Sequence, residues 1–169
     1  MSRAFVKEPD NDSPEDLPDL PISSQPNYVT PEGLAHLRQR LNETQRRSAD
    51  MRDNTVGQMQ ERARTERDIR WLQARIASAR LVTAEGQSSD QVGFGATVTL
   101  AENDGRTYTY RIVGEDEADP ARGLVSWASP LARALVGAQV GHVVTWQRPA
   151  GSIDVEVQAI RYDVPPPAI

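Results

Sequence analysis

Two aspartates, Asp50 and Asp53, are the residues whose type and spacing best suit chemistry at a metal ion. They lie three positions apart near the end of a predicted helix, so their carboxylates can face one side and share a hydrated Mg²⁺. A plainer alternative makes both of them solvated turn residues, with Asp50 helping to end one helix and Asp53 capping the next. We expect no stably bound metal and no cofactor beyond a transient Mg²⁺.

Three arginines, Arg46, Arg47 and Arg52, surround these acids and could contact phosphate groups. Arginine is also common on exposed helix faces, so an unpartnered solvated surface is the alternative. Cysteine is absent, which excludes disulfides, thiolate metal sites and cysteine nucleophiles. The two histidines, His36 and His142, are far apart in the sequence and disfavour a zinc site or a histidine-based triad.

The distribution of charge says more than the net charge of −5. Residues 30–82 carry eleven arginines against seven acids, whereas the segments before and after them are acidic. A basic middle between acidic flanks suits a part that meets phosphate and a part that meets basic protein, or else a solvated helix face. No apolar stretch approaches the roughly 18–20 residues of a membrane span, so we expect a cytoplasmic protein that contacts no membrane.

The chain of 169 residues divides by composition into two structured parts with flanking tails. Residues 1–29 are acidic and proline-rich, which predicts a disordered tail, and residues 164–169 form a second proline-rich tail. Thr30 and Pro31 then suit the start of a helix. Apolar residues recur at alternating spacings of three and four through residues 30–82, broken by a turn-rich stretch at 50–57. This pattern predicts an antiparallel helical hairpin, a short coiled coil, whose second seam passes through Met59, Glu66 and Leu72.

A polar linker at residues 83–91 precedes a second domain at residues 92–163. The β-rich runs at 92–100 and 107–113 surround an Asn-Asp-Gly hairpin turn, and further strands are expected at 124–127, 140–147 and 153–161. Ser129 and Pro130 suit the start of one short helix. The predicted fold is therefore α+β, with a helical hairpin followed by a mostly antiparallel sheet and one helix.

Four short motifs of this second domain, kept in order and spacing, resemble the C-terminal domain of the bacterial Gre transcription elongation factors, GreA and GreB. They are FGATV at 94–98, YRIVGEDEAD at 110–119, SPLARAL at 129–135 and PAG at 149–151. The TPEG sequence at 30–33 is similar to the start of that family's N-terminal helix. The resemblance implies an FKBP-like second domain and a coiled coil that enters the secondary channel of RNA polymerase.

That resemblance gives roles to the residues singled out above. It implies that Arg46, Arg47 and Arg52 contact nascent RNA or the channel, and that the Mg²⁺ near Asp50 and Asp53 is shared with the polymerase. It implies contact with DNA only indirectly, within the elongation complex, by a protein that we expect to be monomeric and not itself an enzyme. It also implies polymerase docking by a separate set of residues: Asp116, Glu117, Asp119, Ser129 and Pro130.

The hairpin departs from the family members that stimulate transcript cleavage. Those factors carry a Gly-Asp pair followed by Glu-Asn-Ala at the hairpin end, and neither sequence occurs between the two predicted helices here. Each arm is also roughly two helical turns shorter, a loss of about 10 Å of reach. The shortened arms favour one alternative, a regulator without cleavage activity similar to the regulator of nucleoside diphosphate kinase. The FKBP-like fold class suggests another, a prolyl isomerase, which the small number of aromatic residues disfavours.

Overall fold

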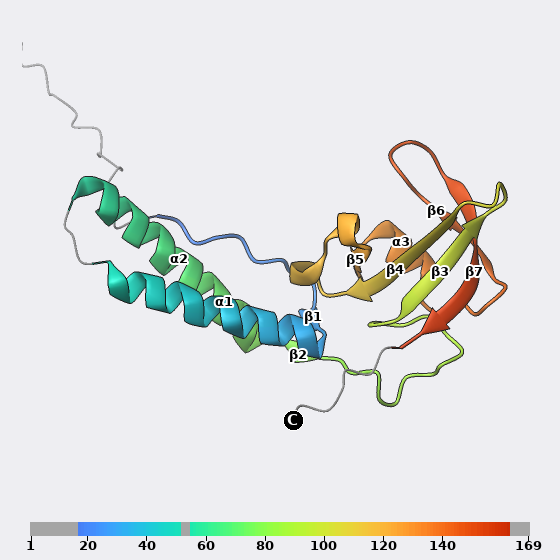
Figure 1. Ribbon diagram of the computed structural model, residues 1–169, viewed down its shortest axis with the longest axis horizontal. Helices are drawn as coiled ribbons and strands as arrows, with labels where there is room; N and C mark the ends of the chain where they lie inside the picture. Colours follow the sequence, from blue (N-terminus) through green and yellow to red (C-terminus); the bar gives the residue numbers. More distant parts are fainter. Residues whose placement is uncertain (1–16, 52–54, 163–169) are drawn as a thin grey trace, which may run out of the picture. The chain divides into compact units, whose positions relative to one another are not determined.

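The computed structural model describes residues 17–51 and 55–162. This part of the chain divides into two compact units, which Figure 1 shows as a pair of helices and a sheet domain. The first unit comprises residues 17–22 and 37–77, and the second comprises residues 23–36 and 78–162. No helix within the described ranges is both long and apolar enough to cross a membrane.

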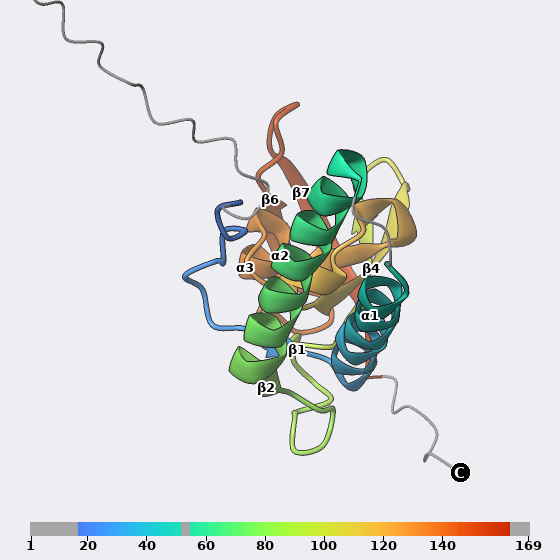
Figure 2. The same ribbon diagram turned by 90° about the vertical axis from the view of Figure 1, so that its left-hand side faces the viewer.

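The first unit is built on an antiparallel pair of helices, α1 (Pro31–Asp50) and α2 (Val56–Ser78). The two helices lie side by side in both ribbon views (Figures 1 and 2). Leu72 of α2 is buried, as its seam position predicts, and Leu37 of α1 is buried too. With 20 and 23 residues, the helices are about 30 Å and 35 Å long at a rise of about 1.5 Å per residue. The predicted helical hairpin is confirmed.

The buried face of α2 differs from the predicted seam at one point. Glu66 was expected in the seam, but it is exposed, and its neighbour Thr65 is buried instead. The Thr65 hydroxyl donates a hydrogen bond to the Glu61 carbonyl (2.8 Å), which satisfies it within the helix. A threonine that bonds to its own helix costs far less to bury than an ionised carboxylate does. The polar part of the seam is therefore displaced by one residue, while Leu72 stays buried.

The second unit begins with a short parallel pairing between β1 (Tyr28–Val29) and β2 (Arg80–Leu81). Val29 is 1% exposed, so this segment differs from the disordered tail expected for residues 1–29. Thr30 follows as the predicted cap of α1, and its hydroxyl accepts a hydrogen bond from the Gly33 N–H (3.0 Å).

The main sheet of this unit has five strands in the order β5-β4-β3-β7-β6. Only β4 and β5 are parallel, and the other neighbours are antiparallel. One short helix, α3 (Pro130–Leu135), completes the domain, so the predicted α+β class is confirmed. The strands are β3 (Thr97–Glu102), β4 (Thr107–Val113), β5 (Leu124–Ser126), β6 (Val143–Trp146) and β7 (Ile153–Arg161).

The hydrophobic core lies between one face of this sheet and α3. Alternate residues of the central strands are buried, as period-two strand geometry requires. The most buried members are Val98, Leu100, Ile112, Val155 and Val157 of the sheet and Leu131, Ala132 and Leu135 of α3.

The first predicted strand, at residues 92–100, is shorter in the structure because β3 begins only at Thr97. Gly95 has a φ of +84°, and the Ala96 N–H donates to the Gly93 carbonyl (3.2 Å), so this stretch turns before the strand. The Asn-Asp-Gly turn is as predicted, with Gly105 at a φ of +86° between β3 and β4.

Candidate functional site

The first candidate site is the end of the hairpin where α1 stops and α2 begins, which we call its outer end. Asp50 is the last residue of α1 and is exposed, while Arg52 and Asp53 lie outside the described residues. The Arg62 guanidinium of α2 donates a hydrogen bond to the Met51 carbonyl (2.6 Å), which caps the end of α1. In the part of the chain that the structure describes, no three His, Cys, Asp or Glu side chains are grouped to hold a metal ion.

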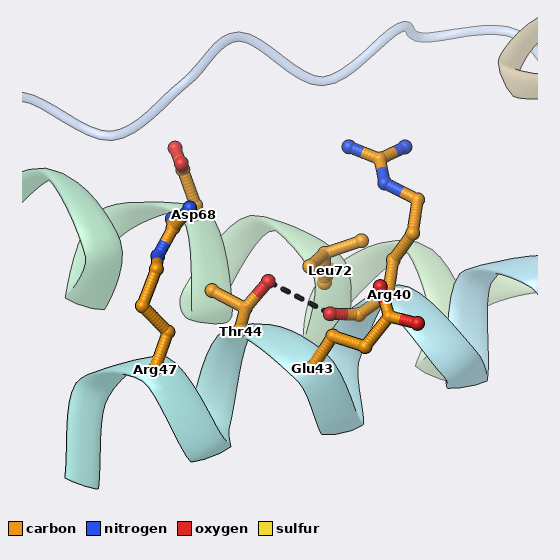
Figure 3. Close-up of a pocket in the computed structure, with 6 residues that line it drawn as sticks. All are labelled: Arg40, Glu43, Thr44, Arg47, Asp68 and Leu72. Atoms are coloured by element: carbon orange, nitrogen blue, oxygen red, sulfur yellow. Dashed lines mark hydrogen bonds between the residues drawn. The ribbon is translucent and has the colours of Figure 1, made fainter. Parts of the chain in front are cut away.

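A groove of about 380 Å³ runs between α1 and α2 beside these residues (Figure 3). Arg47 lines it and extends toward Asp68 of α2, whereas Arg46 does not line it, and both arginines are exposed. The Thr44 hydroxyl donates to the Arg40 carbonyl (2.7 Å) within α1. Cations and acids alternate along the groove, so it is not a purely cationic phosphate site. Its lining residues are Arg40, Glu43, Thr44, Arg47, Asp68 and Leu72.

Glu117, one of the expected docking residues, is engaged inside the second unit. It ends a short 3₁₀ helix, η1 (Glu115–Glu117), that follows β4. Its carboxylate accepts hydrogen bonds from the Thr30 N–H (3.0 Å) and the Gly114 N–H (3.1 Å), and from the Thr30 hydroxyl. Since Thr30 is the cap of α1 and is 1% exposed, Glu117 serves as an additional cap from a distant part of the sequence. The carboxylate is therefore committed to an internal network.

Two glycines leave the space that this carboxylate occupies. A Cβ atom on Gly33 would lie 2.1 Å from the carboxyl carbon of Glu117. A Cβ atom on Gly114 would lie 2.8 Å from a Glu117 carboxylate oxygen and 2.4 Å from the Tyr28 carbonyl oxygen. Real Cβ atoms do not approach other atoms this closely. Gly33 must therefore be glycine as long as Glu117 stays in place, and Gly114 is restricted by the Tyr28 backbone as well.

An ion pair lies beside the same cap. Arg111 of β4 approaches the Glu32 carboxylate at 3.4 Å. Partial burial alone would raise the pKa of Glu32, but this effect is outweighed. Hydrogen bonds from its own backbone N–H and from Thr30, together with the charge of Arg111, hold the pKa of Glu32 below its ordinary value.

The parallel pairing of β4 with β5 brings most of the remaining docking candidates to one end of the sheet. Val113 is opposite Ser126, so the chain leaves both strands at the same end. Asp116 of η1 follows the first strand, and Ser129 and Pro130 follow the second. We call the surface formed by Asp116, Ser129 and Pro130 the docking end.

Ser129 also has a structural role, because its hydroxyl oxygen accepts a hydrogen bond from the Ala132 N–H (3.2 Å) as the cap of α3. Asp119 lies elsewhere, since it precedes η2 (Pro120–Arg122) and bridges to Leu124 at the start of β5. Its backbone N–H donates to the Leu124 carbonyl (2.9 Å). Asp119 is therefore separated from the docking end by the length of β5.

This chain is similar in sequence to known proteins. A family model described as "Transcription elongation factor, GreA/GreB, C-term" matches residues 87–162. The chain is 44% identical over 98 residues to the transcription elongation factor GreB of Neisseria meningitidis, covering 57% of this chain and 60% of that protein. It is 33% identical over 153 residues to GreA of Desulfovibrio desulfuricans, covering 85% of this chain and 94% of that protein.

Among solved structures, the GreA factor homolog 1 protein of Thermus thermophilus is 26% identical, with a TM-score of 0.40 over 81% of this chain and 99% of that one. The sequence relationship to GreA of Desulfovibrio desulfuricans extends over the hairpin as well as the sheet domain, since it takes in 85% of this chain. The chain therefore belongs to the GreA/GreB family of transcription elongation factors.

Proposed function

We propose that this chain binds RNA polymerase with its hairpin in or near the secondary channel of the enzyme and regulates elongation there. Membership of the GreA/GreB family is the observation that supports this proposal most strongly. The hairpin unit supplies an extended element about 30 Å long, and eleven arginines in residues 30–82 suit contact with nucleic acid phosphates. The chain modulates a reaction that the polymerase performs and carries out none of its own.

Docking is assigned to Asp116, Ser129 and Pro130 in this proposal. They lie at the end of the sheet where β4 and β5 both terminate, so one partner surface can contact all three. Glu117 is left out of this set because its carboxylate is held by Thr30 and Gly114.

Stimulation of transcript cleavage would use Asp50, with Asp53, to hold a Mg²⁺ transiently in the polymerase active site. Such a metal must lie about 2.1 Å from a carboxylate oxygen, or one water molecule further away. The two helices, of 20 and 23 residues, favour a second candidate function, a regulator that occupies the channel without promoting cleavage. The regulator of nucleoside diphosphate kinase is the model for that alternative.

Purified backtracked elongation complexes distinguish the two candidates. RNA release and binding are measured on the same complexes with wild-type protein and with an Asp50→Ala/Asp53→Ala variant. Glu66→Ala is the matched control, because Glu66 is an exposed acid of the hairpin away from its outer end. Release that the double variant abolishes and the control retains supports cleavage stimulation. Tight binding without release supports a channel-occupying regulator, and absence of binding refutes both.

A further inference from the structure

Residues 17–22, Leu-Pro-Asp-Leu-Pro-Ile, lie against α2 in an extended conformation (Figure 1). The Asp19 carboxylate pairs with the Arg70 guanidinium at 2.8 Å. A second contact comes from the adjacent residue Trp71, whose indole N–H donates a hydrogen bond to the Pro21 carbonyl (3.3 Å). Two consecutive residues of α2 therefore hold this segment, which we call the strap.

The sequence of the strap suits this role. Its two prolines, Pro18 and Pro21, are three residues apart, about one turn of a polyproline helix. Proline restricts the backbone to extended conformations before any contact forms, so less conformational entropy is lost when the strap docks. Leu17 and Leu20 are partly buried, which adds apolar contact to the two polar ones.

Two arginines and one aromatic ring lie on the helices beneath the strap. The Arg40 guanidinium of α1 lies 6.0 Å from the centre of the Trp71 ring, close enough for a weak cation–π contact. With Arg70, these residues form a patch that suits an acidic partner, and Asp19 supplies the acid from within the chain. The contact is shallow, because Arg70 remains 51% exposed and Asp19 remains 73% exposed.

We propose that the strap competes with RNA polymerase for the patch formed by Arg40, Arg70 and Trp71, and so reduces the affinity of the hairpin for the enzyme. This inference rests on the proposed function, in which the hairpin contacts the polymerase. When a segment of the same chain occupies a binding surface, the apparent affinity of a competing partner equals its intrinsic affinity multiplied by the fraction of molecules in which the segment is displaced. Exposed ion pairs are weak and reversible, so the strap opens readily.

The strap contact itself is tested by the NMR signal of the Trp71 indole N–H in the full-length protein, assigned by its loss in Trp71→Phe. Asp19→Arg and Arg70→Asp each place like charges together and should move this signal toward that of a free indole. The double variant Asp19→Arg/Arg70→Asp restores an ion pair of opposite orientation and should return the signal toward its wild-type position. An indole signal unchanged in both single variants would overturn the proposal.

The competition is tested by the affinity of Asp19→Asn for RNA polymerase core enzyme. An exposed ion pair corresponds to a change of about 1.4- to 5-fold in the opening equilibrium, so affinity should increase by up to about five-fold. Glu85→Gln removes the same negative charge from the 83–91 segment and should leave the affinity at the wild-type value. An Asp19→Asn variant with an altered indole signal but wild-type affinity overturns the competition alone. Absence of polymerase binding by every protein, wild type included, overturns the proposed function and this inference together.

Discussion

Gly33→Ala is expected to destabilise the protein, although an alanine in a helix is ordinarily more stable than a glycine. The first turn of α1 would gain at most about 1 kcal/mol from the higher helix propensity of alanine. The new Cβ, however, would lie 2.1 Å from the carboxyl carbon of Glu117, so that carboxylate must leave its place. Its hydrogen bonds with Thr30 and Gly114 would then be lost.

Hydrogen bonds to a charged group contribute about 1.5–3 kcal/mol, and Thr30 is too deeply buried for water to replace them. The net expectation is a free energy of unfolding about 0.5–2 kcal/mol lower than in the wild type. Urea unfolding followed by circular dichroism and tryptophan fluorescence measures this change. Gly57→Ala is the matched control, because Gly57 lies in the first turn of α2 and, apart from its chain neighbours and its own helix backbone, no atom of the described residues lies within 4 Å of its Cβ position. This variant should be as stable as the wild type or more so.

A double-variant cycle ties the effect to the carboxylate. Glu117→Ala should itself lower the free energy of unfolding by about 1.5–3 kcal/mol, because the same hydrogen bonds are lost without any gain in helix propensity. In that background the space beside Gly33 is empty, and Gly33→Ala should no longer destabilise the protein. The reasoning is refuted if Gly33→Ala stabilises the wild type as much as Gly57→Ala does.

Three further predictions concern acid stability, docking and a helix cap. Because the pKa of Glu32 is lower in the folded protein, the unfolded chain binds more protons at acidic pH. The ionised Glu32 carboxylate therefore stabilises the fold at neutral pH, and this contribution is lost as pH falls below about 4.5. In Glu32→Gln, this part of the acid dependence of the free energy of unfolding should disappear. Asp116→Lys and Pro130→Ala should each weaken binding to RNA polymerase in an equilibrium titration, with unfolding curves close to wild type, and unchanged affinity in both would refute the docking assignment. Ser129→Ala should lower the free energy of unfolding by about 1 kcal/mol through loss of the cap of α3, whereas Ser129→Thr should retain most of it in the same denaturation assay.

The parts of the fold that depend on local chemistry could be predicted from the sequence. Thr30 and Pro31 begin α1, Ser129 begins α3, and Gly105 turns the hairpin between β3 and β4. In each case the residue acts on a backbone only a few positions away. The helical hairpin followed by a sheet domain was predictable for the same reason, because periodicity is a local property of the sequence.

The parts that depend on distant partners could not be predicted in this way. Glu117 bonds to Thr30 across 87 positions of sequence, and no local pattern distinguishes it from its acidic neighbours. The glycines at positions 33 and 114, which leave room for the Glu117 carboxylate, were the only sequence signal of this contact. A glycine can also be required by a turn or a helix end, so this signal is not specific. The strap is a similar case, since Asp19 and Arg70 are 51 positions apart.

The placement of the hairpin within RNA polymerase is the claim on which the proposed function depends. Because the chain contains no cysteine, a single label can be attached through Thr55→Cys, at the exposed start of α2. An iron chelate that generates hydroxyl radicals there should cut the polymerase subunits that line the secondary channel, and excess unlabelled protein should suppress the cuts. The same label at Asn103→Cys, in the exposed turn between β3 and β4, should leave the channel uncut. Equal cutting from both positions, or none from Thr55→Cys in a complex that binds, would contradict insertion of the hairpin.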